Sequence, residues 1–148
     1  MAASTELGVL RFASDNRSMS ELLFVYGTLH PDRAPAQIAS TARRLKPLGK
    51  ATVRGCLYDL GAYPGVLLAD ESDNTAAIIH GELFRLPDGP EGSDLLARLD
   101  AYEDFRADDP QHSLFLRQRT QATFEGGARL TCWIYTYNRS HPEGPRIR

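Results

Sequence analysis

The stretch from Leu22 to Leu29 reads Leu-Leu-Phe-Val-Tyr-Gly-Thr-Leu, and it decides the fold class. A short apolar run that ends at a glycine is typical of a strand buried on both faces. The same reasoning predicts further strands over residues 52–60, 66–69, 77–86, 115–124 and 128–137. Helices are expected over residues 35–45, where Pro35 suits a first turn, and after Ser93, which offers an N-cap.

The two predicted helices are not inserted regularly between the strands. This order argues against a doubly wound parallel sheet and favours an α+β architecture. We expect a small, mostly antiparallel β-barrel of five to six strands with the helices outside it, because closure hides the strand edges. Glu125-Gly-Gly127 separates the last two strands and predicts a hairpin.

Length, composition and charge limit the classes of protein that this chain can represent. It has 148 residues, of which 42% are apolar and 24% charged, and its formal net charge is −2. The near-neutral charge provides no basic surface for nucleic acid, and no apolar run approaches the roughly 20 residues that span a bilayer. We therefore expect no nucleic-acid partner, no membrane association and a cytoplasmic protein. The arginine pairs Arg43–Arg44 and Arg117–Arg119 are interpreted as solvated faces.

The first 18 residues differ in composition from the rest. They are rich in Ala, Ser and Thr, and the regular pattern begins only after Met19. We expect residues 1–18 to form a loosely attached N-terminal arm, with an extra ordered strand over residues 8–12 as the alternative. Residues 19–148 are expected to form a single domain.

Cysteines, histidines and glycines give no sign of a metal or cofactor site. Cys56 and Cys132 lie in apolar, strand-like stretches and are expected to behave as small buried hydrophobes, although a disulfide between them is an alternative. The four histidines lack metal-ligand spacing. No Walker A loop, Rossmann glycine pattern or Gly-x-Ser-x-Gly elbow is present. The prediction is a protein without metal, nucleotide or other cofactor.

Two stretches break local rules, and such positions are where function is expected. The first is Asp100-Ala-Tyr-Glu-Asp104, which crowds three carboxylates at the end of a helix, where the macrodipole favours cations. These surroundings would raise the pKa of any carboxyl group that is partly buried there and suit it to acid–base catalysis near neutral pH. The alternative is an acidic, solvated helix end without a function.

The second stretch is Tyr26-Gly27-Thr28-Leu29. A buried strand that ends in Gly-Thr turns sharply, and consecutive backbone N–H groups in such a turn can bind a carboxylate or an oxyanion. Gly27 would allow a ligand to approach closely because it has no side chain. The alternative is an ordinary tight turn.

Taken together, these stretches make the sequence resemble the γ-glutamylcyclotransferase-like (AIG2-like) family. The first strand of that family ends in Tyr-Gly-[Ser/Thr]-Leu, as Phe24-Val-Tyr-Gly-Thr-Leu29 does. Three further blocks follow in the family's order: Gly55-Cys-Leu-Tyr-Asp-Leu-Gly-Ala-Tyr-Pro-Gly65, Ile79-His-Gly-Glu-Leu-Phe84 and Leu99-Asp-Ala-Tyr-Glu103. The resemblance covers residues 22–138. One departure is visible, since Phe115-Leu-Arg117 stands where the family usually has Tyr-x-Arg.

The resemblance implies an enzyme that cyclises a γ-glutamyl group to 5-oxoproline and releases an amine, amino acid or peptide. It implies Glu103 as the catalytic residue and Tyr26, Gly27, Thr28 and Leu29 as substrate-binding residues, with no cofactor. The partner is then a small γ-glutamyl molecule, and the chain is a monomer or a homodimer. A non-catalytic binding module with the same cavity is the alternative function. Within the enzyme class, removal of a γ-glutamyl protecting group in a biosynthetic pathway is a second alternative.

Overall fold

The computed structural model describes residues 21–26, 36–60, 64–69, 76–138 and 146–147. Neither of the two described α-helices has the length and apolar character needed to cross a bilayer. The described strands and α-helices are β2 (Leu22–Val25), α2 (Ala36–Ala42), β3 (Lys46–Asp59), β4 (Pro64–Leu68), β5 (Ala77–Arg85), α3 (Gly89–Tyr102), β6 (Phe115–Phe124), β7 (Arg129–Tyr137) and β8 (Arg146–Ile147).

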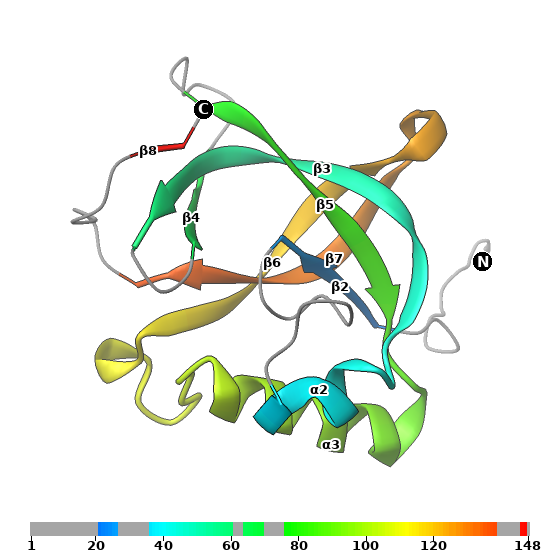
Figure 1. The fold of residues 1–148 in the computed structure, drawn as a ribbon, viewed down its shortest axis with the longest axis vertical. Coiled ribbons are helices and arrows are strands. Elements are labelled where there is room, and N and C mark those ends of the chain that lie inside the picture. Colours follow the sequence, from blue (N-terminus) through cyan, green and yellow to red (C-terminus); the bar gives the residue numbers. More distant parts are fainter. Residues whose placement is uncertain (1–20, 27–35, 61–63, 70–75, 139–145, 148) are drawn as a thin grey trace, which may run out of the picture.

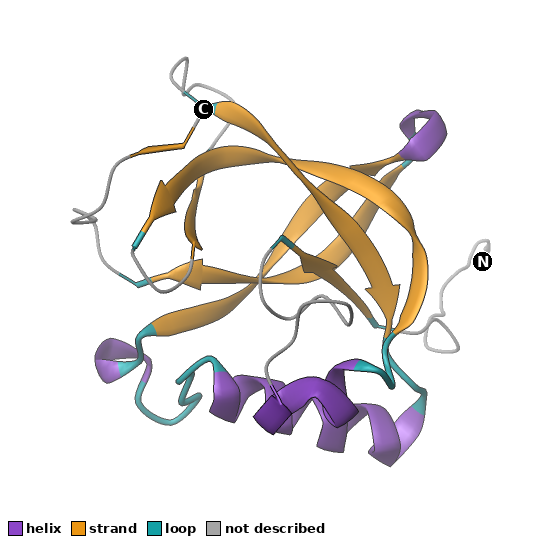
Figure 2. Cartoon of the chain, viewed as in Figure 1, coloured by secondary structure: helices purple, strands orange, loops and turns teal. Residues whose placement is uncertain are grey.

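Five of these strands close into a barrel in the order β3-β5-β2-β7-β6. The barrel closes where β6 pairs with β3, at Thr52↔Thr123 and Ala51↔Phe124. The contact between β2 and β7 is parallel, whereas the other neighbouring strands of the barrel run antiparallel. Strands β4 and β8 extend the sheet from β3. The α+β barrel with outer helices is thus confirmed, and α2 and α3 lie together below it (Figure 1; Figure 2).

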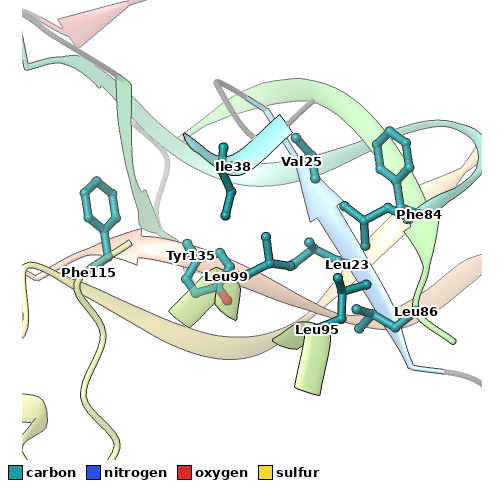
Figure 3. Packing of buried hydrophobic residues seen from close by; sticks show 10 residues of the cluster. Leu23, Val25, Ile38, Phe84, Leu86, Leu95, Leu99, Phe115 and Tyr135 are labelled. Carbon is teal, nitrogen blue, oxygen red and sulfur yellow. The ribbon is translucent and has the colours of Figure 1, made fainter. Parts of the chain in front are cut away.

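The central strand β2 is buried on both faces, as predicted, and it therefore borders two separate cores. Its residue Phe24 packs inside the barrel with members of β3, β5, β6 and β7 such as Ile134. Leu23 and Val25 point the other way, toward the helices, because successive side chains of a strand alternate. The helix-facing core also holds Leu95 and Leu99 of α3, and Figure 3 shows them packed beneath β2. This second core fixes α3 against the barrel.

Helix α3 begins earlier than the sequence analysis predicts. The N-cap is Asp88, and the helix starts with Gly89 and Pro90, so the prediction of Ser93 as the N-cap is wrong. Proline favours the first turn of a helix because its fixed φ suits that position and its missing N–H would have no partner there. Ser93 lies inside the helix at an exposed position.

Other elements also differ from the predictions, and helix α2 ends at Ala42 rather than at Leu45. Strand β3 begins at Lys46 rather than Thr52 and accommodates Pro47 beside a register shift. Strand β4 begins at Pro64, two residues before the start predicted at Val66. Strand β8 falls in a polar tail for which no strand is predicted. The predicted hairpin is confirmed, with positive φ angles at both of its glycines.

Both cysteines are buried and free, so the alternative of a disulfide is excluded. Burial raises the pKa of the Cys132 thiol to about 12, although Arg119 acts in the opposite direction. A thiol with so little thiolate at neutral pH is a poor nucleophile. Cys132 is therefore a packing residue of the barrel interior.

The contact between β5 and β2 requires glycine at position 81. A Cβ atom added there would lie 2.5 Å from the carbonyl oxygen of Val25 and 2.5 Å from Cζ of Phe24.

We expect Gly81→Ala to lower the free energy of unfolding by about 1–3 kcal/mol, the usual cost of overpacking. Urea unfolding followed by the fluorescence of Trp133 measures it. His80→Ala, at the exposed neighbouring position, should change stability by less than about 0.5 kcal/mol; equal losses in both variants would contradict the close approach.

Candidate functional site

Glu103 marks the end of α3 and lies just outside the helix-facing core. Its amide donates a hydrogen bond of 2.9 Å to the carbonyl oxygen of the fully buried Leu99. The next residue, Asp104, turns the chain away with a φ of 57°. The Glu103 side chain is partly buried, and this burial raises the pKa of its carboxyl group from 4.5 to about 7. A carboxyl group with this pKa can both accept and donate a proton near neutral pH.

The three carboxylates at this helix end have different surroundings. Asp100 is ion-paired with Arg117, whereas Asp104 is nearly half exposed and forms a longer contact of 3.3 Å with Arg106. Burial, rather than repulsion from neighbouring carboxylates, is the cause of the raised pKa of Glu103. The sequence analysis thus located the unusual carboxyl group, while the mechanism of its pKa shift follows from the fold.

Tyr26 directly follows β2, and the charge of Glu103 at the end of α3 acts on it. Its hydroxyl donates a hydrogen bond of 2.6 Å to the main-chain oxygen of Tyr135. Burial raises the pKa of the Tyr26 phenol, and the negative charge of Glu103 raises it further, while a backbone hydrogen bond of Val66 lowers it. Two of the residues that the sequence analysis selected, Tyr26 and Glu103, are therefore close enough to interact electrostatically. Gly27, Thr28 and Leu29 lie outside the described residues.

A polar cluster formed by Asp100, Arg117 and Tyr135 lies near Glu103 and is not predicted from the sequence. Arg117 donates to Asp100 through Nε at 2.8 Å and through Nη2 at 3.2 Å, and the Tyr135 hydroxyl donates to the same carboxylate at 2.7 Å. Arg117 is only 17% exposed, so its interpretation as part of a solvated face is wrong. Arg119, on the same strand, is 49% exposed and fits that interpretation. The available signal was the carboxylate at Asp100, three residues before Glu103 and hence on the same side of the helix.

Phe115, where the related sequences usually carry Tyr, is a core residue here. It is 4% exposed and packs in the helix-facing core. Its ring meets the ring of Tyr137 edge to face, with the centroids 5.7 Å apart. An added hydroxyl would need a polar partner in this environment. Within the described part of the chain, no group of three or more His, Cys, Asp or Glu side chains is arranged to hold a metal ion.

The structure is a closed barrel with outer helices, and one of these helices, α3, ends at a partly buried carboxyl group. The family model described as "Gamma-glutamyl cyclotransferase, AIG2-like" matches residues 23–148. The chain belongs to this family.

Similar proteins agree with this assignment. The curated protein named "Putative gamma-glutamylcyclotransferase" from Vibrio cholerae is 29% identical over 123 residues, which cover 83% of this chain and 87% of that protein. An AIG2-like protein of Mus musculus has a TM-score of 0.60 at 19% identity, covering 84% of this chain and 82% of the other. YkqA from Bacillus subtilis has a TM-score of 0.60 at 22% identity, and the match covers 87% of this chain but only 38% of YkqA. At these identities the two structures show the shared fold alone.

The raised pKa of Glu103 predicts a pH-dependent stability. Because the folded state holds the proton more tightly than the unfolded state, this group stabilises the fold below pH 4.5, and the contribution is lost as the pH rises to about 7. Glu103→Gln removes this loss, so the variant should exceed the wild type in stability by about 1–3 kcal/mol at pH 8 and match it near pH 4.5. Urea unfolding at both pH values measures the difference. A wild type that is more stable than the variant at pH 8 would contradict the burial of this carboxyl group.

Proposed function

We propose that this protein cyclises the γ-glutamyl group of a small molecule to 5-oxoproline and releases an amine, an amino acid or a peptide. The observation that carries the proposal is the partly buried Glu103, whose pKa is raised to about 7 and whose charge acts on Tyr26. The membership of the chain in the cyclotransferase family supports the choice of reaction.

The chemistry needs a base and then an acid at one place. In the proposed reaction the Glu103 carboxylate takes a proton from the α-ammonium group of the substrate. The freed amine attacks the γ-carbonyl carbon, which forms the ring C–N bond and an oxyanion. The ring nitrogen then loses its second proton to water. The oxyanion collapses, the bond to the leaving nitrogen breaks, and the Glu103 carboxylic acid returns the first proton to that nitrogen. Ring closure within one molecule has a high effective concentration, so no covalent intermediate is required.

The second requirement is a set of donors for the substrate carboxylate and for the oxyanion. We assign this role to the backbone N–H groups of Gly27, Thr28 and Leu29, which follow Tyr26 directly in the chain. Tyr26 would line the pocket, since the charge of Glu103 acts on its phenol. Donors that are already oriented stabilise a developing oxyanion more strongly than water does.

The base step predicts the pH dependence of the reaction. Because the carboxylate form of Glu103 must be present, kcat/KM should rise with pH and level off above about pH 7, where this group is ionised. Initial rates of 5-oxoproline release between pH 5 and 9 measure the profile, with a substrate whose amine has a separately determined pKa. An acid limb centred near pH 4.5 would contradict a buried Glu103 as the base.

The assay that tests the proposal is 5-oxoproline release from a panel of γ-glutamyl-amines, γ-glutamyl-amino acids and γ-glutamyl peptides. We expect turnover of at least one class, and the preferred class identifies the leaving group. Calorimetric titration with the same compounds accompanies the assay. Binding of a γ-glutamyl compound without any turnover would instead establish a binding module and overturn the enzyme assignment.

A further inference from the structure

We propose that Asp100, Arg117 and Tyr135 act as positioning residues for the carboxyl group at the end of α3. The inference deepens the proposed function and rests on it, because it treats Glu103 as the catalytic residue. None of the three is assigned a contact with the substrate.

The first observation is the geometry of the Asp100 carboxylate. It accepts two hydrogen bonds from the Arg117 guanidinium, at 2.8 and 3.2 Å, and one from the Tyr135 hydroxyl at 2.7 Å. The side chains of Asp100 and Arg117 are only 16% and 17% exposed. A bidentate pair shielded from water in this way holds its orientation more firmly than an exposed ion pair does. It therefore ties the last turn of α3 to strands β6 and β7.

Arg117 also contacts the chain on the other side of Glu103. Its guanidinium carbon lies 5.6 Å from the ring centroid of Phe105, two residues after Glu103, and 4.3 Å from that of Trp133. The Phe105 amide donates to the main-chain oxygen of Asp100 at 2.9 Å. The same guanidinium thus contacts both a residue before Glu103 and a residue after it. A helix end that is held on both sides cannot fray without breaking these contacts.

Tyr135 links this cluster to the other half of the candidate site. Its hydroxyl binds Asp100, while its main-chain oxygen accepts the hydrogen bond from Tyr26. Burial, Asp100 and Glu103 all raise the pKa of the Tyr135 phenol, and Arg117 lowers it, so these three charged groups surround one phenol. Tyr135 is 3% exposed and sits in the helix-facing core (Figure 3). One buried residue therefore sets the spacing between the Glu103 helix and the Tyr26 strand.

The first test separates positioning from a purely structural role. Tyr135→Phe keeps the ring and removes the hydroxyl, so it should fold and should lower kcat by about 10- to 100-fold while KM changes by less than about threefold. Arg119→Gln is the matched control, because Arg119 lies two residues from Arg117 and stacks on the same Trp133 ring at 4.0 Å without contacting Asp100. It should leave kcat unchanged. Equal losses of kcat in both variants would overturn the inference.

The second test measures whether the pH at which Glu103 titrates rises or falls when a charge of the Asp100–Arg117 pair is removed. Glu103 interacts electrostatically with Tyr26 and Tyr135, and its neighbours in the chain form two ion pairs, Asp100 with Arg117 and Asp104 with Arg106. Arg117→Gln leaves the Asp100 charge uncompensated and should move the titration of Glu103 to higher pH. Asp100→Asn leaves the guanidinium uncompensated and should move it to lower pH. Shifts of the same sign, or no shift, would contradict the placement of this pair.

Carbon-13 NMR of labelled glutamate carboxyl groups follows this titration without a substrate. Glu103→Gln identifies the resonance by its loss. The titration therefore tests the positioning cluster even in a protein that releases no 5-oxoproline, so failure of the inference and failure of the proposed function are distinguished. Arg117→Lys restores the charge but not the two-point contact; it should return the titration toward the wild-type pH while kcat stays reduced. Full recovery of kcat by lysine would overturn a role for the bidentate geometry.

Discussion

Glu103→Gln is expected to lower kcat for 5-oxoproline formation by about 10²- to 10⁴-fold, the range that positioned acid–base groups contribute. Glutamine is close in shape and still fits the partly buried position, but it neither accepts the proton of the ammonium group nor returns one to the leaving amine. The substrate carboxylate would still bind to the proposed backbone donors, so KM should change little. Steady-state kinetics on the best substrate of the panel measures both constants.

The matched control for this variant is Asp104→Asn. Asp104 is the adjacent carboxylate, it is nearly half exposed, and asparagine tolerates its positive φ as well as aspartate does. We expect less than about a threefold change in kcat for it, since exposed charges have small effects. A Glu103→Gln variant with the activity of the wild type would remove Glu103 from the mechanism.

The second large effect is expected from Leu99→Ala, with a loss of about 2–5 kcal/mol in the free energy of unfolding. Leu99 is fully buried in the helix-facing core, and its carbonyl oxygen accepts the hydrogen bond that ends α3 at Glu103. Truncation removes apolar contacts and leaves a cavity that the barrel and the helix cannot both close. Such a loss is a large part of the stability of a domain of this size.

Urea denaturation followed by the single tryptophan, Trp133, reports this loss, because that ring packs against the same core. The comparison is Ile78→Ala, which truncates a large apolar side chain that is 54% exposed. Its cost should stay below about 0.5 kcal/mol. Similar costs at both positions would mean that α3 is not anchored through this core.

The hydrophobic pattern predicts the strands well, because the buried positions of a strand are occupied by apolar residues. Leu22–Val25, Ala77–Arg85 and the final hairpin appear close to their predicted ranges. Where local signals compete, the prediction fails: Pro90 and Ser93 each suit the start of a helix, and the helix begins at the earlier of the two. Strand β8 exists through its pairing with β3 and leaves no local trace.

The candidate site shows the same division. The unusual position of Glu103 at a helix end is visible in the sequence, because carboxylates are disfavoured there. The pairing of Asp100 with Arg117 joins α3 to β6 across 17 residues of sequence, and the burial that raises the pKa of Glu103 arises only in the folded chain. The sequence around a single arginine in an alternating strand does not distinguish a buried, ion-paired side chain from an exposed one.

Identification of the product in water enriched in oxygen-18 tests the central claim most directly. Cyclisation uses the amine of the substrate itself, so it predicts 5-oxoproline without the heavy isotope and one equivalent of released amine. Hydrolysis would instead give glutamate with one oxygen-18 atom in its γ-carboxyl group. Mass spectrometry distinguishes the two products in a single reaction. Unlabelled 5-oxoproline, formed by the wild type and not by Glu103→Gln, is the predicted result, and labelled glutamate would contradict the proposed reaction.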